Sequence, residues 1–139
     1  MKDFNKDNLA RKVVPNPEEE GREIELFVRR SQNLDRVTQA KAEALNGIVK
    51  EHDLENMKLT PRQISHLAIG LGLKPRDLID ADIDNPAVDK DQIGRFEKED
   101  ALTFLSQNLR HMKSPIAKRG DVFILVKEPK EVMKLQKQL

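Results

Sequence analysis

Apolar and polar positions alternate along residues 23–28, and this alternation predicts a β-strand. Ile24, Leu26 and Val28 fall on one face of the predicted strand. Phe27 adds apolar surface to the opposite face, so both faces of this strand carry hydrophobic residues.

A helical spacing replaces the alternation in the next apolar positions, which are Leu34, Val37, Ala44 and Leu45. Ser31 or Asn33 is expected to cap this helix, and the Asn-Gly pair at residues 46–47 is expected to end it. The apolar pair at residues 48–49 then predicts a second strand. A strand-helix-strand crossover is almost always right-handed, so we expect the two strands to lie parallel.

The middle of the chain predicts helices joined by polar segments. A capping box at residues 60–63, with proline at the first helical position, begins the best-defined helix of the chain. Residues 74–80 predict one more short helix, and the aspartates, asparagine and proline of residues 82–94 predict an irregular loop without regular structure. An acidic first turn and apolar spacing over residues 97–109 predict a further helix.

Two short apolar runs flank an Arg-Gly-Asp turn at residues 119–121 and predict a β-hairpin. Pro115 precedes the first of these strands. Because proline cannot donate to a central ladder, it fits a strand start, an edge or a cis bond. Residues 128–131 predict the start of a last helix with three inward apolar side chains, Val132, Met133 and Leu135.

Length and charge limit the class of protein. The 139 residues allow one compact domain, expected over residues 22–139, behind a tail over residues 1–21. Lysine and arginine number 25 against 24 acidic residues, so no net field favours nucleic acid or an anionic membrane. The sequence lacks an N-terminal signal-peptide pattern and an apolar run of the roughly 20 residues that a bilayer span needs, which predicts a cytoplasmic protein.

Cysteine is absent from the chain. Its absence excludes disulfides, thiolate metal ligands and catalysis by a protein thiol. The three histidines, His52, His66 and His111, lack the paired spacing of a zinc site. We therefore expect neither a metal nor another cofactor.

The order of the predicted elements is that of a thioredoxin-like α/β domain, and several motifs resemble one family with that fold. Residues 54–79 resemble the helical insert of the arsenate reductase (ArsC) family, which includes the Spx-type regulators. The Ser-Pro-Ile run at residues 114–116 and residues 128–132 resemble that family's Arg-Pro-Ile strand and closing helix. The resemblance spans residues 23–137. It implies a glutaredoxin-type, mixed four-stranded sheet with a helical insert between its two halves, and a cis bond before Pro115.

The same resemblance indicates where the family's catalytic residues fall. A nucleophilic cysteine stands before a helical arginine with three residues between them, and counting back from Arg36 gives Gln32. A glutamine amide cannot replace a thiolate. The arsenate-binding arginines of the family map onto Asp80, Ser114 and Glu128. Two of these are acids that repel an oxyanion, so the resemblance implies a degenerate site.

Several residues stay candidates for holding a ligand or a partner near the loop of the lost nucleophile: Ser31, Gln32, Asn33, Arg36, Ser114 and Pro115. The plainer interpretation is that the first three belong to a helix cap and that Arg36 is a solvated charge. Five basic residues at strand ends form either a docking patch or, as we expect, ordinary solvated surface: Arg29, Arg30, Lys113, Lys118 and Arg119.

Three functions fit these features. The first is a non-catalytic ArsC-like protein that acts as a protein-binding or regulatory module, for which the Spx resemblance suggests RNA polymerase as a partner. The second is an enzyme that uses glutathione or another thiol and needs no cysteine of its own. The third is a DNA-binding protein that uses residues 60–80 as a helix-turn-helix, although Asp77 and Asp80 disfavour contact with phosphate.

Overall fold

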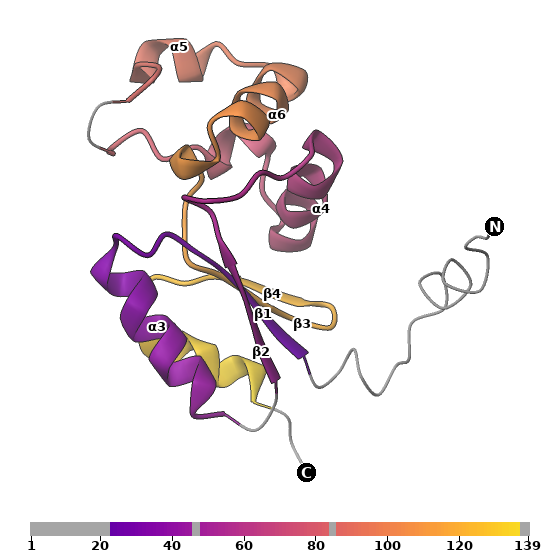
Figure 1. The fold of residues 1–139 in the computed structure, drawn as a ribbon. Helices are drawn as coiled ribbons and strands as arrows, with labels where there is room; N and C mark the ends of the chain where they lie inside the picture. Colours follow the sequence, from indigo (N-terminus) through magenta and orange to yellow (C-terminus); the bar gives the residue numbers. More distant parts are fainter. Residues whose placement is uncertain (1–22, 46–47, 84–85, 137–139) are drawn as a thin grey trace, which may run out of the picture.

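A mixed four-stranded sheet forms the centre of the protein (Figure 1). The computed structural model describes residues 23–45, 48–83 and 86–136; the predicted tail and the predicted Asn-Gly helix end lie outside these residues. The strands are β1 (Glu23–Val28), β2 (Ile48–Asp53), β3 (Ile116–Arg119) and β4 (Val122–Leu125), in the order β2-β1-β3-β4. β1 runs parallel to β2 and antiparallel to β3, which confirms the predicted parallel pair and hairpin.

Helices cover both faces of this sheet. The α-helices are α3 (Asn33–Glu43), α4 (Pro61–Leu71), α5 (Lys90–Gly94) and α6 (Lys98–Gln107), and the 3₁₀ helices are η1 (Pro75–Leu78), η2 (Leu109–His111) and η3 (Pro129–Leu135). α3 and η3 lie side by side on one face (Figure 1). α4 packs on the other face against β4 and joins the insert between β2 and β3. Among the described residues, no helix has the length and apolar character to cross a bilayer.

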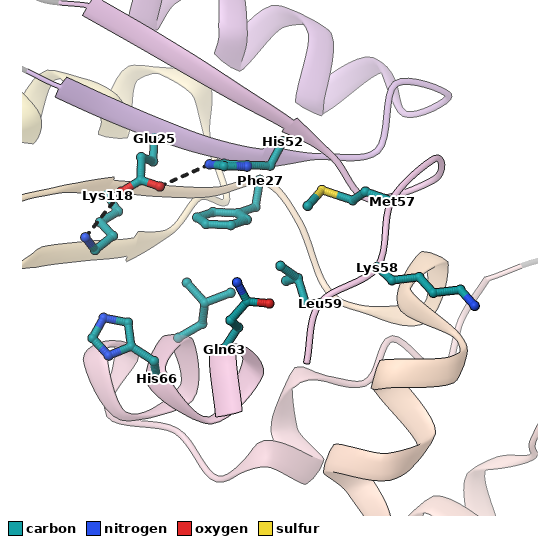
Figure 2. Close-up of a pocket in the computed structure, with 10 residues that line it drawn as sticks. Glu25, Phe27, His52, Met57, Lys58, Leu59, Gln63, His66 and Lys118 are labelled. Carbon is teal, nitrogen blue, oxygen red and sulfur yellow. Dashed lines mark hydrogen bonds and ion pairs between the residues drawn. The ribbon is translucent and has the colours of Figure 1, made fainter. Parts of the chain in front are cut away.

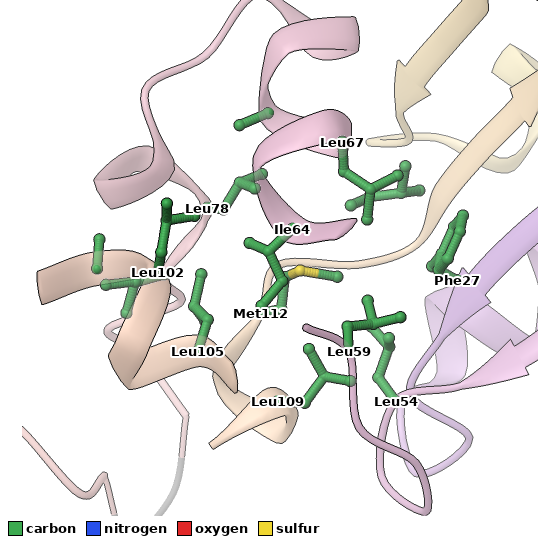
Figure 3. Packing of buried hydrophobic residues seen from close by; sticks show 14 of the residues in the cluster. Phe27, Leu54, Leu59, Ile64, Leu67, Leu78, Leu102, Leu105, Leu109 and Met112 are labelled. Carbon is green, nitrogen blue, oxygen red and sulfur yellow. The ribbon is translucent and has the colours of Figure 1, made fainter. Parts of the chain in front are cut away.

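Two hydrophobic cores follow from the alternation in β1. Ile24, Leu26 and Val28 point to the α3 and η3 face and pack with Val132 and Leu135. The opposite face carries Phe27 into a larger core that the insert supplies, with Leu54, Leu59, Ile64, Leu67, Leu78, Leu102, Leu105, Leu109 and Met112 (Figure 3). The insert is therefore part of the main packing of the domain.

The capping box before α4 is confirmed. The Thr60 hydroxyl accepts the Gln63 N–H at 3.1 Å, and the Gln63 side chain accepts the Thr60 N–H at 2.9 Å. Gly72 follows the helix in the left-handed conformation, with φ of 70°. These local hydrogen bonds satisfy groups that the ends of the helix would otherwise leave open.

Thr60→Ala is expected to lower the free energy of unfolding by about 1 kcal/mol, because the Gln63 N–H loses its acceptor. Thr103→Ala makes the same chemical change at an exposed position inside α6 and is expected to be neutral or slightly stabilising. Urea unfolding of the two variants checks this, and equal effects would contradict the role of the cap.

Several expectations about helices were wrong in detail. The segment predicted to be irregular contains α5, whose N-cap residue Asp89 forms a capping box with Gln92. The predicted short helix over residues 74–80 is the four-residue 3₁₀ turn η1, and the predicted last helix is the 3₁₀ helix η3. Met133 of η3 does not point inward but is half exposed.

A further correction concerns α3, whose cap and buried face both differ from the prediction. Gln32 is the N-cap residue and makes no capping bond with its side chain, so neither Ser31 nor Asn33 plays that part. Val37 is exposed, while Thr38 and Ala42 are buried. The helix therefore turns a more polar face to the sheet than its apolar spacing indicated.

Candidate functional site

Arg29 lies at the end of β1 and connects three segments that are distant in the sequence. Its Nε donates to the Ser114 hydroxyl at 2.7 Å, and Nη2 forms an ion pair with Asp80 at 3.0 Å. Nη1 donates to the Arg110 carbonyl at 3.3 Å. The residue is only 6% exposed, so this guanidinium is a buried cation whose charge Asp80 neutralises.

Asp35, in the first turn of α3, contacts the same cluster through the backbone of Arg29. It is almost fully buried, and its Oδ2 accepts the Arg29 backbone N–H at 2.7 Å. Burial raises the pKa of Asp35 above its ordinary value, while the hydrogen bond from the Arg29 backbone opposes that rise. The carboxyl holds the start of the loop after β1 against the first turn of α3.

Asp35→Ala is expected to cost about 1–3 kcal/mol of stability, because the buried Arg29 N–H loses its acceptor, while Asp35→Asn keeps an acceptor oxygen and costs less.

The pKa of Asp35 is raised in the folded state above the 3.8 of the free side chain. Protonation of Asp35 therefore stabilises the folded state. This contribution is fully present below pH 3.8 and is lost as the pH rises through the folded-state pKa of Asp35.

Urea unfolding between pH 7 and pH 4 measures this dependence. The wild type is expected to gain stability relative to Asp35→Asn as the pH falls, since asparagine does not titrate. A difference that stays constant, or that changes in the opposite direction, would contradict the raised pKa of Asp35.

The loop after Arg29 presents exposed polar side chains on a fixed backbone. Ser31, Gln32 and Asn33 are all exposed. Both the N–H and the hydroxyl of Ser31 donate to the Glu55 carboxylate, and the Gln32 N–H donates to the Arg29 carbonyl at 2.9 Å. Hydrogen bonds thus hold this loop in place, while the side chains of Gln32 and Asn33 are exposed to solvent.

Two arginines beside the loop hold its backbone as well. The Arg36 Nη1 donates to the Arg30 carbonyl at 2.7 Å. Arg30 itself makes two hydrogen bonds to Glu51 of β2, at 2.6 and 2.9 Å. Arg36 is therefore exposed but engaged with the loop, which differs from the expected solvated charge.

The structure brings together some of the positions that the family resemblance singled out. Asp80 and Ser114 both contact Arg29, and the Ser114-Pro115 bond is cis as predicted. Pro115 is buried, so it shapes the chain but offers no exposed surface to a ligand. Glu128 is the N-cap residue of η3 and pairs with Lys130 rather than with Arg29.

A shallow cavity of about 380 Å³ opens beside the Arg29 cluster. Arg29, Asp80 and Ser114 line it, and Leu34, Leu125 and Val126 give it apolar surface. Lysine side chains complete the lining at Lys113 and Lys127. The cavity offers an apolar contact next to positive charge.

The five basic residues at the strand ends fit neither interpretation drawn from the sequence, a docking patch or ordinary solvated surface. Arg29 and Arg119 are buried, and the Arg119 Nη1 donates to the Leu135 carbonyl at 2.9 Å. Lys118 pairs with Glu25 at 3.4 Å on the α4 face of the sheet. The five basic residues therefore form neither one docking patch nor a plain solvated surface.

The role of Arg29 was missed in the sequence, although one signal was present. Arg29 continues the face of β1 that carries Phe27, because side chains two residues apart point the same way in a strand. A charged residue there must find partners when the insert covers that face. Those partners, Asp80 and Ser114, lie 51 and 85 residues away, beyond any local pattern.

This arrangement contains no thiol that could act as a nucleophile. The chain has no cysteine, and the one buried guanidinium of the cluster is bonded to a carboxylate, a hydroxyl and a carbonyl. Within residues 23–45, 48–83 and 86–136, no three histidine, aspartate or glutamate side chains gather in an arrangement that could hold a metal ion.

Comparison with known proteins supports the fold. No protein-family model and no curated protein matches this sequence. Among solved structures, "Arsenate reductase from Vibrio cholerae" is 11% identical, with a TM-score of 0.70 over 81% of this chain and 97% of that one. A YffB protein is 10% identical, with a TM-score of 0.67 over 82% and 99%. A "possible arsenate reductase" from Streptococcus mutans is 12% identical, with a TM-score of 0.58 over 79% and 97%. The chain thus has the thioredoxin-like fold of ArsC-type arsenate reductases.

Proposed function

We propose that this protein is a non-catalytic relative of ArsC-type reductases that binds a protein partner with the face around residues 31–33. The fold is that of arsenate reductases. Gln32, at the position where the family resemblance places the nucleophile, takes part in recognising the partner. The proposal rests on how the residues around that position are bonded.

The internal bonding of Arg29 is the observation that carries the proposal. An oxyanion site needs hydrogen-bond donors that face the ligand with their charge available. Here the Arg29 guanidinium already forms an ion pair with Asp80 at 3.0 Å, and its Nε donates to the Ser114 hydroxyl at 2.7 Å. Together with the absence of any thiol in the sequence, this bonding supports a site used for structure and recognition rather than reduction.

The fixed loop supplies the recognition surface. A partner that binds a pre-ordered loop loses less conformational entropy than one that must first order it. The amides of Gln32 and Asn33 can both donate and accept, and the Ser31 hydroxyl, which donates to Glu55, can still accept. Exposed polar groups on a rigid scaffold are a common form of binding site.

The adjacent cavity indicates the chemistry of the partner segment. Leu34 and Leu125 would receive an apolar side chain, while Lys113 and Lys127 favour a carboxylate beside it. We therefore expect a protein segment that carries an apolar residue next to an aspartate or glutamate.

The helix-turn-helix alternative has less support. η1 is a single 3₁₀ turn of four residues, and its Leu78 is fully buried in the core of the insert. Helix-turn-helix proteins lay a recognition helix in the major groove with several side chains reaching the base edges. Asp77, in the same turn, adds negative charge.

Photo-crosslinking from position 32 tests the proposed face. A benzophenone amino acid at Gln32 is expected to capture one protein in native cells, and Lys113→Glu in the same chain is expected to weaken that crosslink severalfold. The matched control carries the probe at Lys98, an exposed residue at the start of α6. RNA polymerase subunits are probed among the products because of the Spx resemblance. The same crosslink from both positions, or none from position 32, would overturn the proposal.

A further inference from the structure

The two edges of the sheet differ in how they are protected from pairing with another strand. β2, at one edge, carries ionisable side chains at four of its six positions, from Lys50 to Asp53. β4, at the other edge, is a wholly apolar run of valine, phenylalanine, isoleucine and leucine. Charged side chains are a common device that keeps an edge strand from pairing with another chain. β4 lacks this device and is the edge open to a further strand.

The main-chain groups of Phe123 and Leu125 point away from β3. The Val126 N–H donates to the Pro115 carbonyl at 2.9 Å, and main-chain bonding between antiparallel strands recurs at every second residue. The even-numbered residues of β4 therefore bond to β3, and the odd-numbered residues face outward. No other described residue bonds to the main-chain groups of Phe123 and Leu125. The outer edge of β4 thus carries unpaired donors and acceptors.

The free charges at this edge stand at the two ends of β4 and have opposite signs. Asp121 precedes the strand and Lys127 follows it; both are exposed, and neither forms an ion pair with a described residue. The nearby charge of β3 is already paired within the chain. Figure 2 shows Glu25 between His52 and Lys118, 3.0 Å from the histidine Nε2 and 3.4 Å from the lysine Nζ.

A second copy of the chain complements these features when its β4 runs antiparallel to the first. With the two Ile124 residues at the twofold axis, Phe123 of each copy lies opposite Leu125 of the other, and their outward main-chain groups form a ladder of hydrogen bonds. The same register sets Asp121 of each copy opposite Lys127 of the other. Moving the axis to Phe123 or Leu125 breaks both charge pairs, so the charges select one register.

We infer that this protein forms a symmetric homodimer through β4, with Ile124 at the twofold axis and Asp121 of one protomer paired with Lys127 of its partner. The dimer joins two four-stranded sheets into one continuous sheet. A contact of one strand with one strand is small, so the dimer is weak and reversible. Leu125 and Lys127 also line the cavity beside Arg29, so a second copy competes with the proposed protein partner, although the inference does not depend on that proposal.

Sedimentation velocity of the full chain measures the association. A dimer that grows between about 10 µM and about 1 mM is expected. Asp121→Lys and Lys127→Asp each create like-charge pairs and are expected to weaken self-association by about fivefold or more. An equimolar mixture of these two variants has opposite charges at both ends of the strand pair, so the mixed dimer is expected to form about as tightly as the wild-type dimer. Asp91→Lys, at an exposed position of α5, is the matched control and is expected to dimerise like the wild type.

A single introduced thiol tests the register, because the chain has no cysteine of its own. Ile124→Cys places two thiols opposite each other with Cα atoms about 4.5 Å apart, within the range of a disulfide. Val122→Cys is the matched control on the same strand. Val122 is the more exposed residue, but its two copies lie four residues apart along the strand pair, about 14 Å, which is too far for a disulfide. Oxidation is expected to give a covalent dimer with Ile124→Cys and a monomer with Val122→Cys.

Several results would overturn the inference: a wild-type chain that stays monomeric over this range, charge variants that dimerise like the wild type, or equal crosslinking from positions 122 and 124. The exposed charge variants decide the matter if Ile124→Cys fails to fold. Hydrogen exchange identifies another occupant of the edge. Slow exchange of the Phe123 and Leu125 amides at concentrations where the chain is monomeric would mean that a segment of the same chain covers β4, which would also overturn the inference.

Discussion

Gln32→Cys is expected to place a reactive thiol before the first turn of α3 without restoring arsenate reduction. Position 32 is the exposed N-cap of an 11-residue helix, where the partial positive charge of the helix end favours a thiolate. A pKa one unit below the usual 8.5 or so raises the thiolate fraction at pH 7 by roughly tenfold. Alkylation at that pH is expected to be a few times faster, because the intrinsic nucleophilicity of a thiolate falls as its pKa falls.

Ala44→Cys is the matched control, because Ala44 is the exposed C-cap residue of the same helix. The negative end of the helix disfavours a thiolate there, so this thiol is expected to react more slowly than a cysteine in an unfolded peptide. Equal alkylation rates at positions 32 and 44 would contradict the placement of residue 32 at the N-terminus of α3. Arsenate turnover by Gln32→Cys alone would show that an anion site had survived.

Catalysis is not expected to return with the thiol, because the oxyanion would still lack charged donors. Asp80 and Glu128 are acids and Ser114 is neutral, where the family resemblance implies arginines. The Arg29 guanidinium stays bonded to Asp80 and Ser114. Removing a single donor from a preorganised anion site commonly costs about 10²–10³ in rate, so the loss of several abolishes measurable turnover.

Arg29→Met is expected to lower the free energy of unfolding by about 2–3 kcal/mol, the largest effect expected for any single side chain of the site. Breaking a fully buried ion pair typically costs about 3–5 kcal/mol, and the 22% exposure of the Asp80 side chain reduces that figure. Arg36→Met, which removes an exposed guanidinium, is expected to cost no more than about 0.5 kcal/mol. Urea unfolding at pH 7 measures both.

A double-mutant cycle separates the ion pair from the packing of the long side chain. Asp80→Ala is expected to cost clearly less in the Arg29→Met background than in the wild type, because the first change has already removed its partner. Additive effects, or an Arg29→Met variant as stable as the wild type, would mean that the cluster contributes little to the fold.

The parts of the fold that could be predicted are those that short-range pattern controls. The alternation over residues 23–28 placed β1 with Ile24, Leu26 and Val28 in one core and Phe27 in the other, as observed. The capping box before α4 joins residues three apart, so its hydrogen bonds are visible in the local sequence. α5 carries a similar local signal at Asp89 and Gln92, which the surrounding polar residues obscured.

The site could be predicted only in part because its contacts join distant segments. The family resemblance brought Asp80 and Ser114 to one place but assigned no partner to them. That partner is Arg29, which strand parity places on the face that the insert covers, and whose bonds depend on tertiary packing. The buried carboxyl of Asp35 escaped notice for the same reason, since a charged residue in a first helical turn is typical of solvated surface.

The conversion of arsenate to arsenite by the purified wild-type chain tests the central proposal most directly. The assay supplies, in separate reactions, reduced glutathione, glutaredoxin and thioredoxin as electron donors, which also covers an enzyme that borrows its thiol. Our account predicts arsenite formation no faster than in the buffer blank with every donor. Turnover that rises in proportion to the concentration of this cysteine-free chain would contradict it.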